Sequence, residues 1–506
     1  MKSTPLSLIA GVVALAAVTG FAALNAPGDP AAPEAKAATR LPVERSSLLC
    51  PAPSSSDLAS TTYTSFTPAG EGDGGAGEAE LKPALALTTD EVAEPDPEKE
   101  KKAAAEADKP VVALKEPGRP VGAETSASDA PALVGTATGR LAPGWTAQQT
   151  TAVTAGEARG LLGATCTRPD TDFWFPGAST SKARRDYVHL TNPDDSAAVA
   201  DIELFGPDGP LQSDVGEGIT VPARSSVPML ISTLTSEAVQ DVAVHVTTRS
   251  GRIGALVRVA DDTVGSDWLA PSVDPAETLV LPGIPADATS VQLVAFAPGE
   301  DDADMKVQMM GKSAMFSPAG NDTLRIKSNM TASVDLRDIT RGEPGSLRLT
   351  PVDARRTTPI VAALRVVRGT GSKREVAFIP ATAPVGSRAS VADNRAKGST
   401  LSLTAPGRTA EVRVTASAGS QGGEQTVKTY TVKAGTTLAV VPPVPSGLKG
   451  SYALTVETES GGPVHAARTL ALPEGGVDMF TVQTLADDGG TVEVPTARQD
   501  LSLLDD

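Results

Sequence analysis

The sequence predicts an all-β protein, in which tandem immunoglobulin-like β-sandwich modules follow an N-terminal hydrophobic helix. Three observations support this prediction: a repeated pattern, a two-residue alternation of apolar and polar side chains, and the lack of capped amphipathic stretches of helical length after residue 26. A sandwich of this type needs about 100 residues. An internal repeat of that size sets the architecture before any single site is considered.

The repeat is clearest in three stretches that begin at residues 220, 325 and 431. Thr220–Val227, Arg325–Ala332 and Thr431–Leu438 each contain a short apolar strand, a polar turn and a second apolar strand. A strand that runs into proline recurs with similar spacing at residues 190–193, 294–298 and 403–406. Because the order of these landmarks is kept in every period, the chain is expected to contain successive copies of one module.

Within the copies, apolar residues recur at every second position. Val242, Val244 and Val246 alternate with Ala, His and Thr, which is typical of strands with one buried face. Turn-forming runs such as 206–209 and 461–463 separate such strands. The alternative architecture is a single long β-solenoid, whose repeats would be shorter than the observed period.

The N-terminus has the pattern of an export signal. Lys2 precedes an uncharged, mostly apolar run from Leu6 to Leu24, which is longer than the usual core of a cleaved signal and close to the length of a spanning helix. Residues 1–26 are therefore predicted to be either a signal peptide or a signal anchor, and residues 27–43 a Pro/Ala-rich spacer. In both cases we expect the rest of the chain outside the cytoplasm.

Residues 44–172 are predicted to be a degenerate first copy of the module. Gly160–Cys166 resembles Gly251–Val257, which places the end of this copy near residue 172. Between Glu71 and Asp129, acidic residues outnumber basic ones by 15 to 7. Segments of this composition bury too little apolar surface to fold, so residues 67–140 are predicted to be a disordered acidic insertion. The later modules are predicted at residues 173–275, 276–380 and 381–506, the last with a C-terminal tail.

The two cysteines, Cys50 and Cys166, are predicted to form a disulfide. A sparse, even number of cysteines in an exported chain favours one bridge. It would join the first and last strands of the first copy. The alternative is a pair of free, buried thiols.

Charge and motifs argue against several functions. The net charge is −17, which disfavours nucleic acid and anionic membrane surfaces as partners. The sequence lacks Gly-x-Ser-x-Gly and His-Glu-x-x-His motifs. His189, His245 and His465 each fall in a predicted strand and are not spaced as metal ligands. We therefore expect no enzyme, no catalytic residue and no cofactor.

Two acidic loops are candidates for calcium binding. Asp194 and Asp195 follow one strand, and Asp301, Asp302 and Asp304 occupy the equivalent loop of the next module. Calcium takes six to eight oxygen ligands, which clustered carboxylates can supply. The favoured alternative is a solvated turn, because the third copy has no carboxylate in this loop.

Trp174 and Trp268 are candidates for a ligand platform, since aromatic rings on exported β-sandwiches can stack on sugars. Phe173 and Phe175 flank Trp174, so adjacent rings are expected on opposite faces of one strand. A role in the core or between modules is the favoured alternative for both tryptophans.

Leu49-Cys50-Pro51, the later Cys166 and the run Trp174–Gly177, together with the N-terminal apolar segment, resemble an uncharacterised family. Its members are secreted or membrane-anchored proteins of high-GC Gram-positive (actinobacterial) bacteria, described only as a domain of unknown function. The resemblance covers most of residues 45–480. It implies a location in the cell envelope and supplies no activity.

Taken together, these observations predict an exported, membrane-tethered, non-enzymatic scaffold or adhesion protein of the bacterial cell envelope, built as a rod of modules. Its expected partners are a cell-envelope polymer or other envelope proteins. The alternative is a carbohydrate- or peptidoglycan-binding protein, and a weaker one is a degenerate hydrolase.

Overall fold

The computed structural model describes residues 39–70, 75–86, 108–156, 158–213, 215–474 and 476–494. The predicted hydrophobic helix at residues 1–26 lies outside this range. Within it, no helix is both long and apolar enough to cross a membrane. The chain divides into two compact units, one formed by Met1–Leu41 with Val492–Asp506 and the other by Pro42–Thr491.

In the first unit, the described residues form a two-stranded sheet of β1 (Thr39–Pro42) and β39 (Thr491–Val494). The Nε atom of Arg40 lies 3.3 Å from Oε1 of Glu493. The end of the predicted Pro/Ala-rich spacer is therefore a paired strand.

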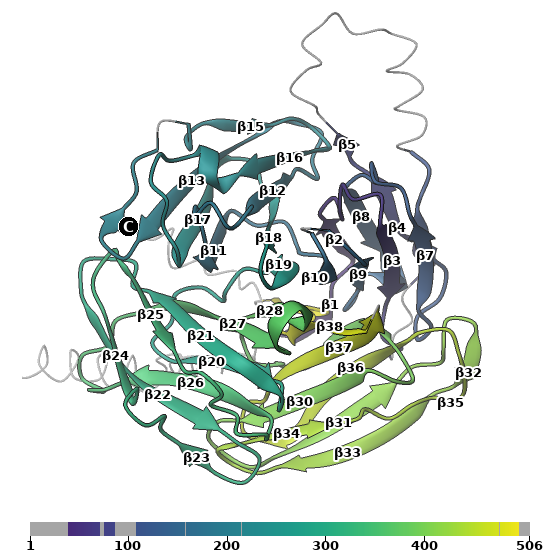
Figure 1. Cartoon of the computed structure of the whole chain (residues 1–506). Coiled ribbons are helices and arrows are strands. Elements are labelled where there is room, and N and C mark those ends of the chain that lie inside the picture. The colour runs from purple at the N-terminus through teal and green to yellow at the C-terminus, as the bar shows by residue number, and fades with distance from the viewer. Residues whose placement is uncertain are drawn as a thin grey trace, which may run out of the picture. The chain divides into compact units, whose positions relative to one another are not determined.

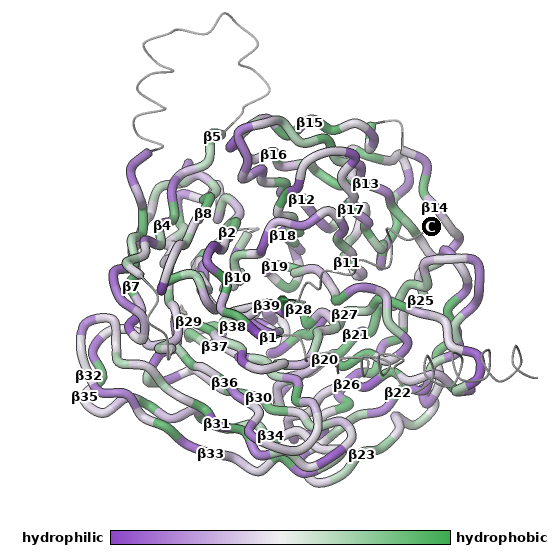
Figure 2. The backbone as a smooth tube through the Cα atoms, turned by 180° about the vertical axis from the view of Figure 1, so that it is seen from behind, coloured by the Kyte–Doolittle hydropathy of each residue, from purple (hydrophilic) through white to green (hydrophobic). Residues whose placement is uncertain are grey.

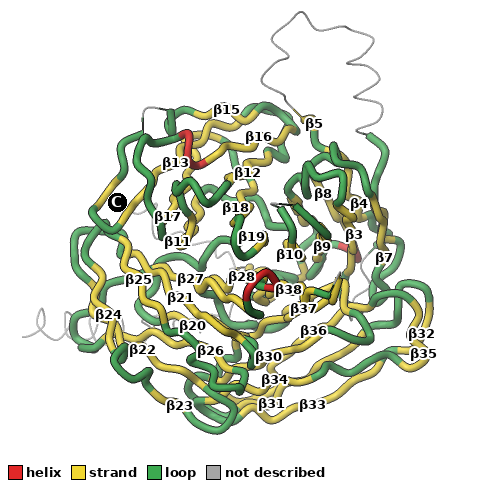
Figure 3. The backbone as a smooth tube through the Cα atoms, viewed as in Figure 1, coloured by secondary structure: helices red, strands yellow, loops and turns green. Residues whose placement is uncertain are grey.

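The second unit contains four successive modules, each with two antiparallel sheets of four main strands (Figure 1). Strands and loops account for nearly all of the described chain (Figure 3), and its helical residues form three short 3-10 helices, at Gly139–Leu141, Ile231–Thr233 and Gly371–Lys373. The predicted all-β class with tandem β-sandwich modules is confirmed.

The strands of the first module are β2 (Arg45–Cys50), β3 (Ala59–Phe66), β4 (Ala79–Pro83), β5 (Leu85–Ala86), β6 (Val112–Leu114), β7 (Val121–Thr125), β8 (Leu133–Thr138), β9 (Thr146–Val153) and β10 (Gly160–Thr165). Those of the second are β11 (Asp172–Ala178), β12 (Tyr187–Thr191), β13 (Ala198–Gly206), β14 (Gly209–Pro210), β15 (Ile219–Val221), β16 (Ser225–Leu230), β17 (Val242–Ser250), β18 (Gly254–Asp261) and β19 (Gly265–Leu269).

The strands of the third module are β20 (Leu279–Ile284), β21 (Ala288–Phe296), β22 (Ala303–Met310), β23 (Met315–Phe316), β24 (Thr323–Ile326), β25 (Thr331–Asp335), β26 (Gly345–Pro351), β27 (Val361–Arg368) and β28 (Glu375–Pro380). Those of the fourth are β29 (Ala389–Asn394), β30 (Ser399–Ala405), β31 (Ala410–Ala416), β32 (Gly422–Glu424), β33 (Thr426–Val432), β34 (Thr436–Val440), β35 (Ser446–Lys449), β36 (Tyr452–Gly461), β37 (His465–Glu474) and β38 (Val477–Leu485).

The same strand order recurs in every module. The sheet that holds the first strand, here called the first-strand sheet, has the orders β2-β8-β4-β6, β11-β17-β13-β14, β20-β26-β22-β23 and β29-β36-β31-β33. The facing last-strand sheet has the orders β10-β9-β3-β7, β19-β18-β12-β16, β28-β27-β21-β25 and β38-β37-β30-β34. β5 of the first module extends the last-strand sheet of the second by pairing with β16.

The module cores come from the two-residue alternation predicted above. Phe173 and Phe175 pair with Val246 and Val244 across β11 and β17, and all four side chains are buried in one core. Hydrophobic and hydrophilic residues are interspersed along the strands (Figure 2). Since successive strand residues point to opposite faces, the side chains between these core positions face a neighbouring module or solvent.

The repeated hairpin contains a left-handed residue at the same place in each aligned copy. Arg224, Asn329 and Gly435 have φ values of 52°, 53° and 69°. Their N–H groups donate to the carbonyl oxygens of Asp194, Ala297 and Ala405, which lie just after or at the end of the second strand of their module. The aligned stretches Thr220–Val227, Arg325–Ala332 and Thr431–Leu438 therefore share one turn geometry as well as one pattern.

The predicted disordered insertion at residues 67–140 is wrong for its described parts. β4 to β8 lie within it and complete both sheets of the first module. Ala79, Leu81, Val112 and Leu114 are buried. The described strands fold because their apolar side chains occupy every second position, with charged residues such as Glu80 and Lys82 at the positions between them. Residues 71–74 and 87–107 lie outside the described range.

The modules also contact one another in a closed series, which corrects the expected rod. The last strands β10, β19, β28 and β38 each contact the next, and β38 contacts β10 (Figure 1). The first and fourth modules meet directly: Gln483 Nε2 donates to Gln148 Oε1 at 3.0 Å, and Arg388 Nη2 donates to the Pro143 carbonyl at 3.3 Å. The first strand of each module also contacts the next module, through β2 with β18, β11 with β27 and β20 with β37, and β29 contacts β9 of the first module.

The predicted disulfide is confirmed. Cys50 at the end of β2 and Cys166 just after β10 are joined across 116 residues. The bridge links the two sheets of the first module through their first and last strands, as expected from the sequence.

Candidate functional site

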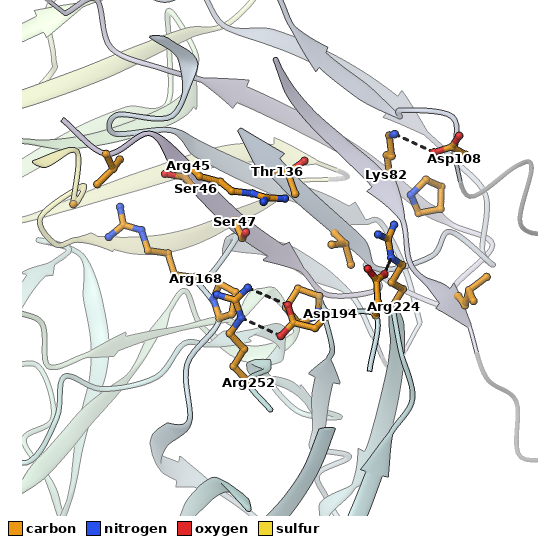
Figure 4. Close-up of a pocket in the computed structure, with 18 residues that line it drawn as sticks. Arg45, Ser46, Ser47, Lys82, Asp108, Thr136, Arg168, Asp194, Arg224 and Arg252 are labelled. Atoms are coloured by element: carbon orange, nitrogen blue, oxygen red, sulfur yellow. Dashed lines mark hydrogen bonds and ion pairs between the residues drawn. The ribbon is translucent and has the colours of Figure 1, made fainter. Parts of the chain in front are cut away.

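A cleft of about 1170 Å³ lies between the first and second modules (Figure 4). Its lining includes cationic side chains, carboxylates and hydroxyl groups. The residues used below are Arg45, Ser47, Lys82, Asp108, Thr136, Arg168, Asp194, Asp195, Arg224 and Arg252.

The first-strand sheet of the first module supplies one side of the cleft. Ser47 on β2 is directly opposite Thr136 on β8, and Glu80 on β4 is opposite Thr136 from the other flank. Leu48 and Leu81, one position further along their strands, are buried in the module core. The alternation that buries these leucines therefore turns Arg45, Ser47 and Lys82 toward the cleft.

Turns of the second module form the other side. Arg252 binds Asp194 through two hydrogen bonds of 3.1 and 3.0 Å, and Arg224 pairs with Asp195. The hydrogen bond from Arg224 lowers the pKa of the Asp195 carboxyl, and the bond to Asp194 raises the pKa of the Arg252 guanidinium. These groups are therefore charged at neutral pH and suited to binding rather than to proton transfer.

Positive charge is in excess over the lining of the cleft. Lys82 lies 3.1 Å from Asp108 and 3.4 Å from Glu80. Within the described chain, the Arg45 guanidinium forms no ion pair or hydrogen bond, and Arg168 donates to the Asp488 backbone carbonyl without a carboxylate partner. In Figure 4 the guanidinium groups of Arg45 and Arg168 accordingly carry no dashed line, whereas those of Arg224 and Arg252 do.

The equivalent contact between the second and third modules is filled by aromatic rings. Trp174 stacks on His245 at a centroid distance of 3.6 Å and on Phe296 at 5.4 Å. Leu49 takes the corresponding place in the first module, since Leu49 bridges Thr167 as Trp174 bridges Ser272. The junction between the first two modules thus lacks the large ring, and Leu49 is buried there against Gly254 of the second module.

The predicted ligand platform at Trp174 and Trp268 is wrong. Their exposed fractions are 7% and 2%, so neither ring can receive a sugar. Trp268 packs edge-on against His189 at 5.1 Å and contacts apolar residues of the first module. Both tryptophans lie between modules, which was the favoured alternative.

The aspartates predicted as calcium ligands do not form a common site in the structure. Asp194 and Asp195 bind arginines, as described above. Asp302 lies 2.9 Å from Arg325 and accepts the Ser328 N–H at 3.0 Å, while Asp301 and Asp304 are exposed. The described ranges contain no group of three or more side chains that could hold a metal ion. The carboxylates separate because each turn places a cation or a backbone donor beside them.

We accordingly expect millimolar calcium to leave the thermal unfolding midpoint unchanged, because a ligand stabilises only a fold that binds it. Differential scanning fluorimetry with and without calcium, with magnesium as the control, tests this expectation. A rise of the midpoint with calcium alone would restore the predicted site.

The three histidines are buried or make contacts with neighbouring side chains and backbone groups. His245 lies between Asp172 and Glu203, with both nitrogen–oxygen distances at 3.0 Å. Burial lowers the pKa of His189 to about 3, and burial also lowers the pKa of His465, which contacts the Thr382 carbonyl, to about 4. None of the three lines the cleft.

A second polar cluster lies where the four last strands meet. Asp267 accepts the Gly163 N–H at 3.0 Å and the Thr481 hydroxyl at 3.0 Å, so residues of three modules meet at one carboxyl. Arg159 of the first module lies 2.9 Å from Glu375 of the third. Burial raises the pKa of Asp267 well above its usual range and that of Glu375 to about 7. These groups hold modules together and face no cleft.

The cleft arginines were not identified from the sequence. The repeat did contain a signal, because the alignment places Arg224 opposite Asn329 and Gly435, two residue types that tolerate a left-handed backbone. Arg45 and Arg168 carry no comparable signal. Their proximity depends on the disulfide-linked ends of the first module and on its contact with the second.

A model described as a family of unknown function (DUF5719) matches residues 121–443, which is more than half of the chain. The match begins at β7 of the first module, includes the whole of the second and third modules, and ends after β34 of the fourth. No curated protein matches the chain.

Proposed function

The chain belongs to this family of unknown function, and from that premise we propose that it is an exported, non-enzymatic scaffold protein of the bacterial cell envelope. Tethering to the membrane through residues 1–26, and a role in adhesion, are parts of the same proposal. Its partners are a cell-envelope polymer or other envelope proteins.

The disulfide is the observation that carries this proposal. Disulfides persist in oxidising compartments outside the cytoplasm and are rare inside it. Cys50 and Cys166 are both buried and already aligned by the first and last strands of their module. The bridge therefore supports a folded state that is reached after export.

The structural use of the candidate catalytic groups supports a non-enzymatic role. The described histidines are packed between modules or bound to neighbouring groups, and the carboxylates of the cleft are paired with cations. A degenerate hydrolase would need a base that faces a cleft. Because Trp174 and Trp268 are buried, they offer no aromatic platform for a carbohydrate. Retention of the protein by purified cell-wall polymer would support the carbohydrate-binding alternative.

Protease shaving of intact host cells, followed by non-reducing mass spectrometry of the purified protein, tests the proposal. We expect external protease to degrade the protein without cell lysis, and the peptides containing Cys50 and Cys166 to be recovered as one linked species. A cytoplasmic protein of similar size serves as the control for lysis. Protection in intact cells together with two free thiols would contradict export.

A further inference from the structure

We propose that the cleft between the first two modules binds a small multivalent oxyanion, a ligand that carries several phosphate or carboxylate groups. Arg45, Arg168 and Arg224 are its main protein contacts. This inference goes beyond the scaffold role and stands on the geometry of the cleft alone.

Arg45 and Arg168 provide the uncommitted positive charge. Arg45 forms no side-chain interaction within the described residues, and Arg168 is held by a backbone carbonyl. A guanidinium donates two parallel hydrogen bonds to a phosphate or a carboxylate, and such charge-assisted bonds are stronger than neutral ones. The chain has a net charge of −17, but the lining of this cleft has a surplus of arginine, which favours an anionic ligand.

Arg224 adds an independent observation. Its φ of 52° is left-handed, a conformation that is costly for side chains with a Cβ atom. The equivalent turns use Asn329 and Gly435, which adopt it with less strain. Residues held in such conformations cluster at functional sites. At this position the second module tolerates the strain and gains a guanidinium that lines the cleft.

The size and composition of the cleft narrow the class of ligand. A volume of about 1170 Å³ exceeds the space that a single phosphate would fill, and typical small-molecule sites have about 300–1000 Å³. Ser47, Thr136 and the paired carboxylates offer further hydrogen-bonding groups along the lining. The ligand is therefore expected to carry more than one anionic group and to span both walls.

Isothermal titration calorimetry of the full chain tests this proposal, with tripolyphosphate and tetragalacturonate as the two probes. We expect at least one probe to bind, more weakly as salt is added. The double variant R45A/R168A should bind about 10-fold more weakly or worse, which corresponds to the loss of a charge-assisted contact. The control R355A/R356A removes two exposed arginines from the turn before β27 and should keep the affinity of the unmodified protein.

Binding of tripolyphosphate alone assigns a phosphate ligand, and binding of tetragalacturonate alone assigns a carboxylate ligand. Failure of both probes to bind the unmodified protein overturns the proposal. So does an R45A/R168A variant that keeps full affinity. The single variant R45A removes no side-chain hydrogen bond or ion pair within the described residues, so it should remain folded and still lose affinity.

A further variant, R224N, separates binding from stability. Asparagine accepts the left-handed turn, as Asn329 does, so we expect a thermal midpoint equal to or above that of the unmodified protein. The affinity for the bound probe should nevertheless fall. If R224N kept its affinity, Arg224 would be excluded from the site, and the argument from its strained backbone would fail.

Discussion

Replacement of both cysteines by alanine, C50A/C166A, is expected to lower the free energy of unfolding of the first module by about 4 kcal/mol. A loop of 116 residues is closed by the bridge, and the chain-entropy model assigns a loop of this size about 4–5 kcal/mol. Alanine is the suitable replacement because both sites are buried, where a serine hydroxyl would need a hydrogen-bond partner. The bridge also links the two sheets of the module that forms one wall of the cleft.

Urea unfolding monitored by tryptophan fluorescence, with Trp145 as the reporter inside this module, measures the effect. Reductant should lower the urea midpoint of the unmodified protein to the midpoint of C50A/C166A. The double variant should not respond to reductant, which makes it its own control. Equal midpoints for the oxidised protein and the variant would show that the loop is constrained by contacts other than the disulfide.

The second large effect concerns Glu375, at the start of β28. Burial raises its pKa from 4.5 to about 7, and Arg159 opposes this shift only in part. Between these two values the folded protein keeps the proton while the unfolded chain releases it. The contribution of Glu375 to stability is therefore present at low pH and is lost as the pH rises through about 7. The shift corresponds to about 3 kcal/mol.

The variant E375Q should remove this dependence, because glutamine resembles the protonated acid and does not titrate. We expect the stability of E375Q relative to the unmodified protein to rise by about 2.5 kcal/mol between pH 5 and pH 8. Buried His189 and His465, with lowered pKa values, destabilise both proteins equally as the pH falls below 6.5, so their effect cancels in the difference. Unfolding curves at a series of pH values supply the measurement.

The exposed Glu343, in the turn before β26, provides a matched control. E343Q makes the same chemical change on the surface, and its stability relative to the unmodified protein should stay constant over the same range of pH. If the stability difference between E375Q and the unmodified protein also stayed constant over this range of pH, the Glu375 carboxylate would be stabilised by water or by a rearranged Arg159.

The repeat made the modules predictable from the sequence, because the hairpins at Thr220–Val227, Arg325–Ala332 and Thr431–Leu438 are local structures with local signals. The disulfide was predictable for a simpler reason, since a chain with two cysteines has a single intramolecular pairing available. The preference for a role of Trp174 in the core or between modules also followed from simple alternation along a strand.

Composition failed where alternation would have succeeded. In β4, buried Ala79 and Leu81 alternate with the charged Glu80 and Lys82. The prediction of disorder used the total charge of residues 67–140, and that total does not reveal so short an alternation. The contact between the first and fourth modules could not be predicted. It depends on surfaces hundreds of residues apart, as with Gln148 and Gln483, and no local signal reports such a pairing. The cleft shares this limit, because its walls belong to different modules.

The contact of β38 with β10 has a consequence for biosynthesis. During synthesis the first module exposes the flank of β10 until the fourth module, which contains β38, has emerged. Domains fold as units in order of synthesis, so the first module waits longest for its last neighbour. A ribosome that stops early would release a product with unpaired β surface, which invites association with other chains. Quality control of this protein therefore depends on the strands of the fourth module that contact the first.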